Sequence, residues 1–134
     1  FMTPMLQILA WTLVLALAQI FLPATAKTIQ FGARWNAGPR DSEIAPPSVI
    51  AGRLDRAQRN LFETLPLFIA AVLIAHVAGV DPALSLLGSQ LYLGSRVLYI
   101  PLYAFGVPGI RSLVWLVGLS GLGAILYAIL TTPI

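Results

Sequence analysis

The chain has 134 residues, of which 58% are hydrophobic and only 10% are charged. Soluble domains carry about 25% charged residues, so the composition favours a single membrane domain over a soluble one. The chain contains no cysteine, which excludes a disulfide framework, a cysteine nucleophile and a cysteine-ligated metal site. Its net charge of +3 results from eight lysine and arginine residues and five acidic residues. A nucleic-acid surface needs such cations on a soluble face, so we expect no nucleic-acid partner.

Four apolar stretches follow one another along the chain. A membrane-spanning helix needs about 20 mainly apolar residues. The predicted helices cover residues 5–24, 49–79, 83–105 and 110–132, and a long connection covers residues 25–48. Turn signals separate the later helices, at Gly79 with Pro82 and at the Gly-Val-Pro-Gly stretch 106–109. The sequence therefore predicts an all-α membrane protein, a bundle of four transmembrane helices.

The first apolar stretch has a second interpretation. Ala24, Thr25 and Ala26 are similar to a signal-peptidase site at the end of an apolar segment. No basic residue precedes that segment, and it is long for the apolar part of a signal peptide. We therefore favour a spanning helix over a cleaved signal.

The cations are unevenly divided between the two sides of the predicted bundle. With four spans, the first and third connections lie on the same side. That side receives Lys27, Arg34, Arg40, Arg53, Arg56, Arg59 and Arg111. The opposite side receives Asp81 and neither lysine nor arginine. Because lysine and arginine favour the cytoplasmic side, we expect the long connection inside the cell and both termini outside.

The second predicted helix begins with a polar stripe. On a helical wheel of about 100° per residue, the stripe consists of Arg53, Arg56, Asn60 and Glu63, with Arg59 at its edge. Opposite charges four positions apart can pair. Asp55 with Arg59, and Arg59 with Glu63, therefore offer an alternative in which the stripe is only a helix extension with local ion pairs.

A polar arc also runs along the third predicted helix. It spans roughly 80° of the wheel and consists of Ser85, Ser89, Tyr92, Arg96, Tyr99 and Tyr103. Such an arc is unfavourable against lipid, so we expect it to face the bundle interior or an aqueous cavity. An ionisable residue inside a span indicates a functional site, and Arg96 is such a residue.

The fourth predicted helix opens with Arg111, whose charge opposes the helix dipole. An anionic ligand or exposure to water must therefore make this position tolerable. Further along, Ser120, Ala124 and Ala128 repeat every four residues. Small residues at this spacing let membrane helices approach closely, so we predict a packing face there.

The arginines of the second, third and fourth helices are expected to converge near the cytoplasmic side. Guanidinium groups match carboxylates and phosphates, while Glu63 can receive an ammonium group. The pattern predicts a small ligand with several anionic groups and one cationic group. Anionic lipid head groups are an alternative. His76 is the single histidine, and without a second ligand we expect no metal site.

At this point the sequence resembles a known family. Residues 56–60 read Arg-Ala-Gln-Arg-Asn and are followed by Glu63 and Pro66. This segment resembles the signature of the MAPEG family, the membrane-associated proteins of eicosanoid and glutathione metabolism. Residues 94–99, then Tyr103 and residues 110–112, are similar to the third and fourth helices of that family. The resemblance covers nearly the whole chain, and the long first connection resembles the bacterial branch.

The resemblance implies a homotrimer in a bacterial inner membrane, with glutathione bound between neighbouring subunits near the cytoplasmic side. It implies glutathione contacts from Arg56, Gln58, Arg59, Asn60, Glu63, Tyr99 and Tyr103. The expected convergence of arginines adds Arg53 and Arg96 to these cofactor-binding residues. For catalysis, the resemblance implies that Arg111 stabilises the thiolate, with Ser112 beside it. It leaves open whether Lys27, Arg34 or neither replaces an arginine that the family carries after its first helix.

The resemblance implies a glutathione transferase or peroxidase, in which a thiolate attacks a lipophilic electrophile or hydroperoxide from the bilayer. Nearby cations favour a thiolate at neutral pH, which agrees with the predicted arginines. The expected partners are other copies of the chain, membrane lipids and a lipophilic small molecule. The alternative is a non-catalytic scaffold of the same fold that binds lipid or another ligand, since fold alone does not determine function.

Overall fold

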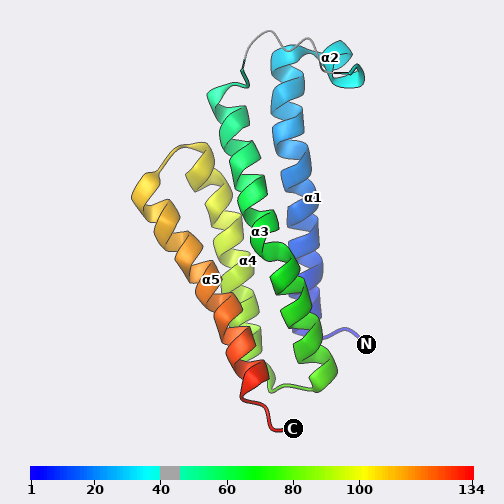
Figure 1. The fold of residues 1–134 in the computed structure, drawn as a ribbon, viewed down its shortest axis with the longest axis vertical. Coiled ribbons are helices and arrows are strands. Elements are labelled where there is room, and N and C mark those ends of the chain that lie inside the picture. Colours follow the sequence, from blue (N-terminus) through cyan, green and yellow to red (C-terminus); the bar gives the residue numbers. More distant parts are fainter. Residues whose placement is uncertain (40–45) are drawn as a thin grey trace.

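A computed structural model describes residues 1–39 and 46–134. In these ranges the helices are α1 (Pro4–Phe31), α2 (Ala33–Ala37), α3 (Val49–Ala78), α4 (Pro82–Ala104) and α5 (Pro108–Leu130). The four long helices run along the long axis of the molecule, and both termini lie at the same end (Figure 1). Arg40, one of the cations expected on the long connection, lies outside the described residues.

The first helix is longer than expected. We predicted that it ends at residue 24 and that a loop follows, but α1 continues to Phe31 and the short helix α2 comes next. The added turns of α1 are stabilised by a salt bridge of 2.7 Å between Lys27 and Asp55 on α3. Gly32, with a φ of 96°, then ends the helix in a conformation that favours glycine. The expected boundary was wrong because the contact that extends α1 joins distant parts of the chain.

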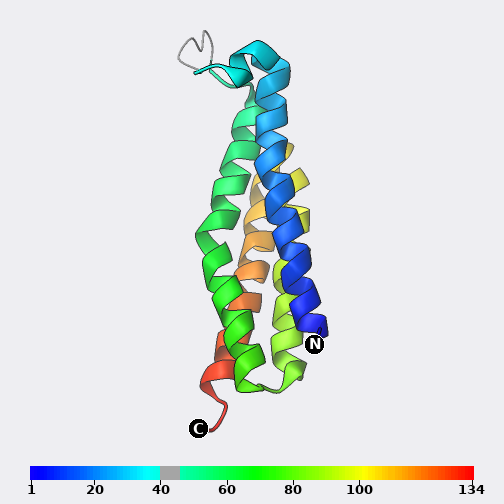
Figure 2. The ribbon, with the colours of Figure 1, turned by 90° about the vertical axis from the view of Figure 1, so that its right-hand side faces the viewer.

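α3 is a single helix of 30 residues although it contains Pro66. Ser48 caps its start by accepting a hydrogen bond of 3.2 Å from the amide of Ala51. Gly79 ends it with a left-handed φ of 66°. At about 1.5 Å per residue, α3 is about 45 Å long and exceeds the bilayer core of about 30 Å. The arginine-bearing start of α3 therefore reaches beyond the turn between α4 and α5 (Figures 1 and 2).

α4 and α5 approach each other closely through glycine. A side chain at Gly88 would collide with the carbonyl oxygen of Gly121, and the reverse also holds. The packing face that we predicted on α5 is partly wrong, since Ala128 is buried, Ala124 is half-buried and Ser120 is exposed. The glycine contact rotates α5 so that the buried stripe passes through Gly121 and leaves Ser120 outside.

The register between α3 and α4 is determined by an aromatic contact. The rings of Phe68 and Tyr92 stack with their centroids 4.0 Å apart. The hydroxyl groups of Tyr92 and Thr64 are hydrogen-bonded at 2.8 Å. Phe68 and Tyr92 are both among the largest fully buried side chains, so this pair forms the centre of the bundle.

Three of the helices in the described ranges, α1, α3 and α5, are long and apolar enough to cross a membrane. α4 is less apolar because one side of it is polar. Most of that side is buried, as predicted, and Tyr103 at its end is half-buried. The exposed fractions are at most 4% at Ser85, Ser89, Tyr92, Arg96 and Tyr99. Large apolar side chains are exposed on the outer surfaces of all four long helices. The polar-in, apolar-out arrangement is that of a membrane protein.

Candidate functional site

Two tyrosines lie one turn apart on α4. Each contacts an arginine, and both arginines lie at the same end of the bundle. The rings of Tyr99 and Tyr103 meet edge to face, with their centroids 5.5 Å apart. The guanidinium carbon of Arg96 lies 4.6 Å from the centroid of the Tyr99 ring. The guanidinium carbon of Arg111, in the first turn of α5, lies 4.6 Å from the centroid of the Tyr103 ring. The two rings thus connect arginines from α4 and α5.

Arg56 brings α3 into the same group. Its Nε donates a hydrogen bond of 3.1 Å to the hydroxyl oxygen of Tyr103, and its guanidinium carbon lies 5.8 Å from the centroid of that ring. Such a cation–π contact stabilises by about 0.5–1 kcal/mol at an exposed site. The rings therefore hold three like charges together without neutralising them. We call Arg56, Arg96, Tyr99, Tyr103 and Arg111 the tyrosine–arginine cluster.

No acidic group of the described residues forms a salt bridge with the arginines of this cluster. In residues 1–39 and 46–134, the single salt bridge is the one between Lys27 and Asp55. The alternative in which Asp55 pairs with Arg59, and Arg59 with Glu63, is therefore wrong. The reason is that Lys27 reaches Asp55 from α1. Arg59 and Glu63 are both exposed, so both are accessible to a ligand.

The two candidates for a further cation differ in their environment. The ammonium group of Lys27 is held by Asp55 at 2.7 Å. Arg34 is exposed on α2, past the end of α1. Lys27 therefore serves to join α1 to α3, and Arg34 is the more accessible of the two.

Arg53 contacts the protein backbone. Its Nη1 donates a hydrogen bond of 3.2 Å to the carbonyl oxygen of Ala104. The guanidinium lies against the turn between α4 and α5, where Gly106 has a φ of 70°. This contact ties the start of α3 to the turn that precedes Arg111. The geometry gives Arg53 a structural role, and its predicted ligand contact stays a prediction.

Arg96 is enclosed by its own chain. Only 3% of the residue is exposed, and its Nη1 donates a hydrogen bond of 2.9 Å to Oδ1 of Asn60. Its Nε and Nη2 are buried. A ligand on the outside of the chain does not reach these two atoms in this arrangement. Arg96 therefore influences the surface through Asn60, which is half-buried.

Gln58 and Ser112 form no hydrogen bond with the cluster among the described residues. Gln58 follows Arg56 by two positions, which turns it by about 200° around α3, and it is half-buried. Ser112 is exposed, and its hydroxyl donates a hydrogen bond of 3.3 Å to the carbonyl oxygen of Pro108 within α5. The structure therefore joins Arg56 and Arg111 but brings neither Gln58 nor Ser112 to them within one chain.

Sequence patterns did not single out Gln19. This residue lies within the apolar helix α1 and is only 2% exposed. Its Oε1 is buried without a hydrogen-bond partner among the described residues. The available signal was a lone amide side chain in an apolar span, four positions before Pro23.

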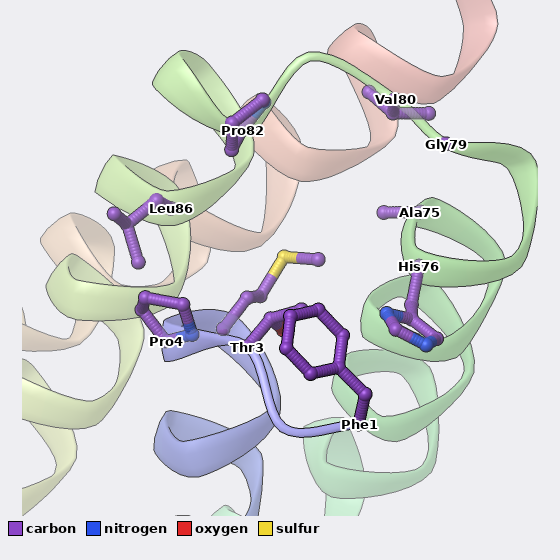
Figure 3. A pocket seen from close by; sticks show the side chains of 10 residues that line it. Phe1, Thr3, Pro4, Ala75, His76, Gly79, Val80, Pro82 and Leu86 are labelled. Atoms are coloured by element: carbon purple, nitrogen blue, oxygen red, sulfur yellow. The ribbon is translucent and has the colours of Figure 1, made fainter.

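A cavity of about 330 Å³ lies at the opposite end of the bundle (Figure 3). It is formed by the start of α1, the end of α3 and the start of α4, and its lining is mainly apolar. Met5, Val80 and Leu86 contribute to it, with His76 at one side. In the described parts of the chain, no three histidine, cysteine or acidic side chains come together as metal ligands. The cavity thus lies at the other end of the bundle from the tyrosine–arginine cluster. Its lining is mainly apolar, whereas the cluster is cationic.

The sequence matches a known protein family. A sequence model of the MAPEG family matches residues 8–131, which is nearly the whole chain. The chain belongs to the MAPEG family. Searches among curated proteins and among solved structures found no match. MAPEG proteins are membrane proteins generally associated with glutathione.

Proposed function

We propose that this MAPEG protein is a glutathione-dependent transferase or peroxidase of the membrane. Bound glutathione supplies a thiolate, which attacks a lipophilic electrophile or hydroperoxide. The tyrosine–arginine cluster carries the proposal, because three guanidinium groups from three helices share two rings. No carboxylate of the described residues forms a salt bridge with any of them.

The charges at this end of the bundle fit glutathione, which has two carboxylates, one ammonium group and one thiol. Arg56 and Arg59 are exposed and suit the carboxylates, and Glu63 is exposed and suits the ammonium group. The amide nitrogen of Asn60 is a further donor, and its orientation is set because Oδ1 is held by Arg96. The ligand is thereby matched by groups of both signs on one face of α3.

Arg111 is the residue that we propose for thiol activation. It is half-buried and held against the Tyr103 ring. A cation near a thiol lowers its pKa from about 8.5 and raises the thiolate fraction at neutral pH. Partial burial strengthens this effect because less water screens the charge. Ser112 is proposed as a neighbouring hydrogen-bond donor, which requires its hydroxyl to leave the carbonyl of Pro108.

We also propose an assembly and a topology. α4 is the fourth spanning helix, with its polar side shielded by α1, α3 and α5. Three copies assemble, and glutathione lies between neighbours, where the exposed Arg59 and Glu63 are covered. The cationic end faces the cytoplasm of a bacterium and both termini face the periplasm, because cations favour the inner side.

The test compares Arg111→Ala with wild type in detergent, using a generic aryl halide as the electrophile. We expect the rate of conjugation to fall by about 10²-fold, as when one charge-stabilising group is removed from an active site. Glutathione affinity should change by less than about threefold, because Arg56, Arg59 and Glu63 remain. Gln7→Ala, at an exposed position near the start of α1 and far from the cluster, is the control and should retain the full rate.

A non-catalytic ligand-binding scaffold is the second candidate. It is favoured by one observation, the hydrogen bond that turns the Ser112 hydroxyl towards its own helix. Glutathione that raises the midpoint of thermal unfolding, without turnover of any aryl halide or lipid hydroperoxide, would select the scaffold. A midpoint that rises with anionic lipid and stays constant with glutathione would contradict glutathione binding altogether.

A further inference from the structure

Gln19 on α1 and Arg96 on α4 have unused hydrogen-bonding groups inside the bundle. The two residues are 2% and 3% exposed. Oε1 of Gln19, and Nε and Nη2 of Arg96, are buried and have no hydrogen-bond partner among the described residues. An unpaired buried polar group costs about 1–3 kcal/mol, and more when it is charged. Donors and an acceptor are thus both available, on helices that contact each other.

The unused donors of Arg96 form one edge of its guanidinium. Nη1 already donates to Asn60. Nε and Nη2 point in parallel from the opposite edge and suit an acceptor that takes two hydrogen bonds. Because both atoms are enclosed by one chain, this acceptor must lie within the bundle.

Pro23 creates a second acceptor at Gln19. Pro23 lies inside α1 and is buried. Proline has no amide hydrogen, so it cannot donate to the carbonyl four positions earlier in a helix, which is that of Gln19. The backbone oxygen of Gln19 therefore lacks its usual helical donor. Two acceptors at Gln19 correspond to two donors at Arg96.

The pairing of the helices places Gln19 and Arg96 at a similar depth along the bundle. Lys27 lies opposite Asp55, and Gln19 is about 12 Å further along α1 from that pair at 1.5 Å per residue. On α3, Asn60 and Thr64 lie about 7.5 and 13.5 Å past Asp55 by the same measure. These two residues bond to Arg96 and Tyr92 on α4. Gln19 therefore lies at the depth of the Arg96–Tyr92 turn.

We propose that this level of the bundle is an internal water site. A water molecule accepts hydrogen bonds from Nε and Nη2 of Arg96 and donates to Oε1 and the backbone oxygen of Gln19. Buried waters make about three hydrogen bonds, in the range of two to four, and this set provides four. A carboxylate of the described residues is not the partner, because Glu63 forms no salt bridge with Arg96 and Asp55 is bound to Lys27.

The water site makes Gln19 a positioning residue. It fixes the guanidinium of Arg96 from α1, and Arg96 in turn fixes Asn60 on α3. Where glutathione is the ligand, which rests on the proposed function, Gln19 also sets the orientation of a ligand-binding amide. The site itself does not depend on the identity of the ligand.

A double-mutant cycle without glutathione tests the coupling. Gln19→Leu should lower the midpoint of thermal unfolding by about 3–6 °C, since two donors of Arg96 lose a partner. In an Arg96→Met background, the same change should have an effect close to zero. Equal effects of Gln19→Leu in both backgrounds would overturn the proposal.

Gln19→Glu keeps the test valid if Arg96→Met does not fold. A carboxylate of the same size next to the free edge of Arg96 should keep the midpoint at or above that of wild type. A midpoint below that of Gln19→Leu would overturn the proposal, because it would mean that the carboxylate is buried without a partner. Gln7→Leu and Gln7→Glu, at an exposed position of α1, are the matched controls and should agree within about 1 °C.

High-resolution density decides whether water is the bridge. Density for a water bonded to both residues supports the site, and a direct bond between Gln19 and the guanidinium overturns it. Glutathione affinity in Gln19→Leu tests the positioning role, with an expected weakening of about threefold to tenfold and a recovery in Gln19→Glu. If no variant, wild type included, binds glutathione, the proposed function fails, while the thermal cycle still decides the water site.

Discussion

At the scale of the residue, Tyr103 makes the largest number of contacts in the cluster. Its hydroxyl accepts from Arg56, its ring lies under Arg111, and its edge contacts Tyr99. A phenylalanine retains the three ring contacts, with Arg56, Arg111 and Tyr99, and loses the hydroxyl. An alanine loses all four. The two substitutions therefore separate the role of the ring from that of the hydroxyl.

We predict that Tyr103→Ala weakens glutathione binding about 10-fold and that Tyr103→Phe weakens it less than about threefold. Two exposed cation–π contacts contribute about 1–2 kcal/mol together, which corresponds to this difference. Isothermal titration in detergent measures both affinities. Tyr127→Ala, at an exposed position of α5, is the control. Equal weakening by both Tyr103 variants would show that the hydroxyl, and not the ring, holds the arginines.

The helical wheel predicted part of this site for a physical reason. The spacing of residues within α4 alone determines which of them share its polar arc. The sequence could therefore predict that Arg96 and Tyr99 lie inside the bundle. Gln58 and Ser112 were predicted by resemblance, and their neighbourhood depends on how helices or subunits face one another. The pairing of Asp55 with Lys27 was also out of reach, because local spacing cannot rank a partner from another helix.

At the scale of the element, the close approach of α4 and α5 depends on a pair of facing glycines. At Gly121, an added side chain would meet the backbone of Gly88, which cannot move aside as a side chain can. At Gly123, two positions later on the same helix, an added carbon meets nothing within 4 Å. Alanine at Gly121 therefore tests the packing between α4 and α5, and alanine at Gly123 tests helix propensity alone.

We predict that Gly121→Ala lowers the stability of the bundle by about 1–3 kcal/mol, the usual cost of overpacking. Gly123→Ala should be neutral or slightly stabilising, because alanine favours a helix by about 1 kcal/mol over glycine. Midpoints of thermal unfolding in detergent measure the difference. Equal midpoints for the two variants would mean that α4 and α5 are less closely packed than described.

The ends of the helices show a similar division between what is local and what is not. Gly79, which ends α3 with a φ of 66°, was predicted as a turn signal because a glycine cap is a local property. The end of α1 was not predicted, because the contacts that extend it past Pro23 come from distant parts of the chain. Their helix is extended by Lys27 and by Gln30, whose side chain accepts from the amide of Ser48 at 2.6 Å.

At the scale of the whole molecule, charge is separated along the long axis. The described lysine and arginine residues belong to one half of the bundle, where α1 ends and α3 begins (Figure 1). The other half holds both termini (Figure 1), Asp81 at the start of α4, and the apolar cavity (Figure 3). In a bilayer, this separation favours a single orientation. The charge distribution of the whole chain thus predicts a single orientation in the membrane.

The chain has no cysteine, so a single introduced cysteine reports its own side of the membrane. Val49 and Val77 stand near opposite ends of α3 and are 68% and 84% exposed. In intact bacterial spheroplasts, a membrane-impermeant maleimide should label Val77→Cys and should label Val49→Cys only after permeabilisation, because the arginines beside Val49 favour the cytoplasm. Full labelling of both variants after permeabilisation is the control for reactivity. Labelling of Val49→Cys alone in intact spheroplasts would reverse the topology and place the tyrosine–arginine cluster outside the cell, away from cytoplasmic glutathione.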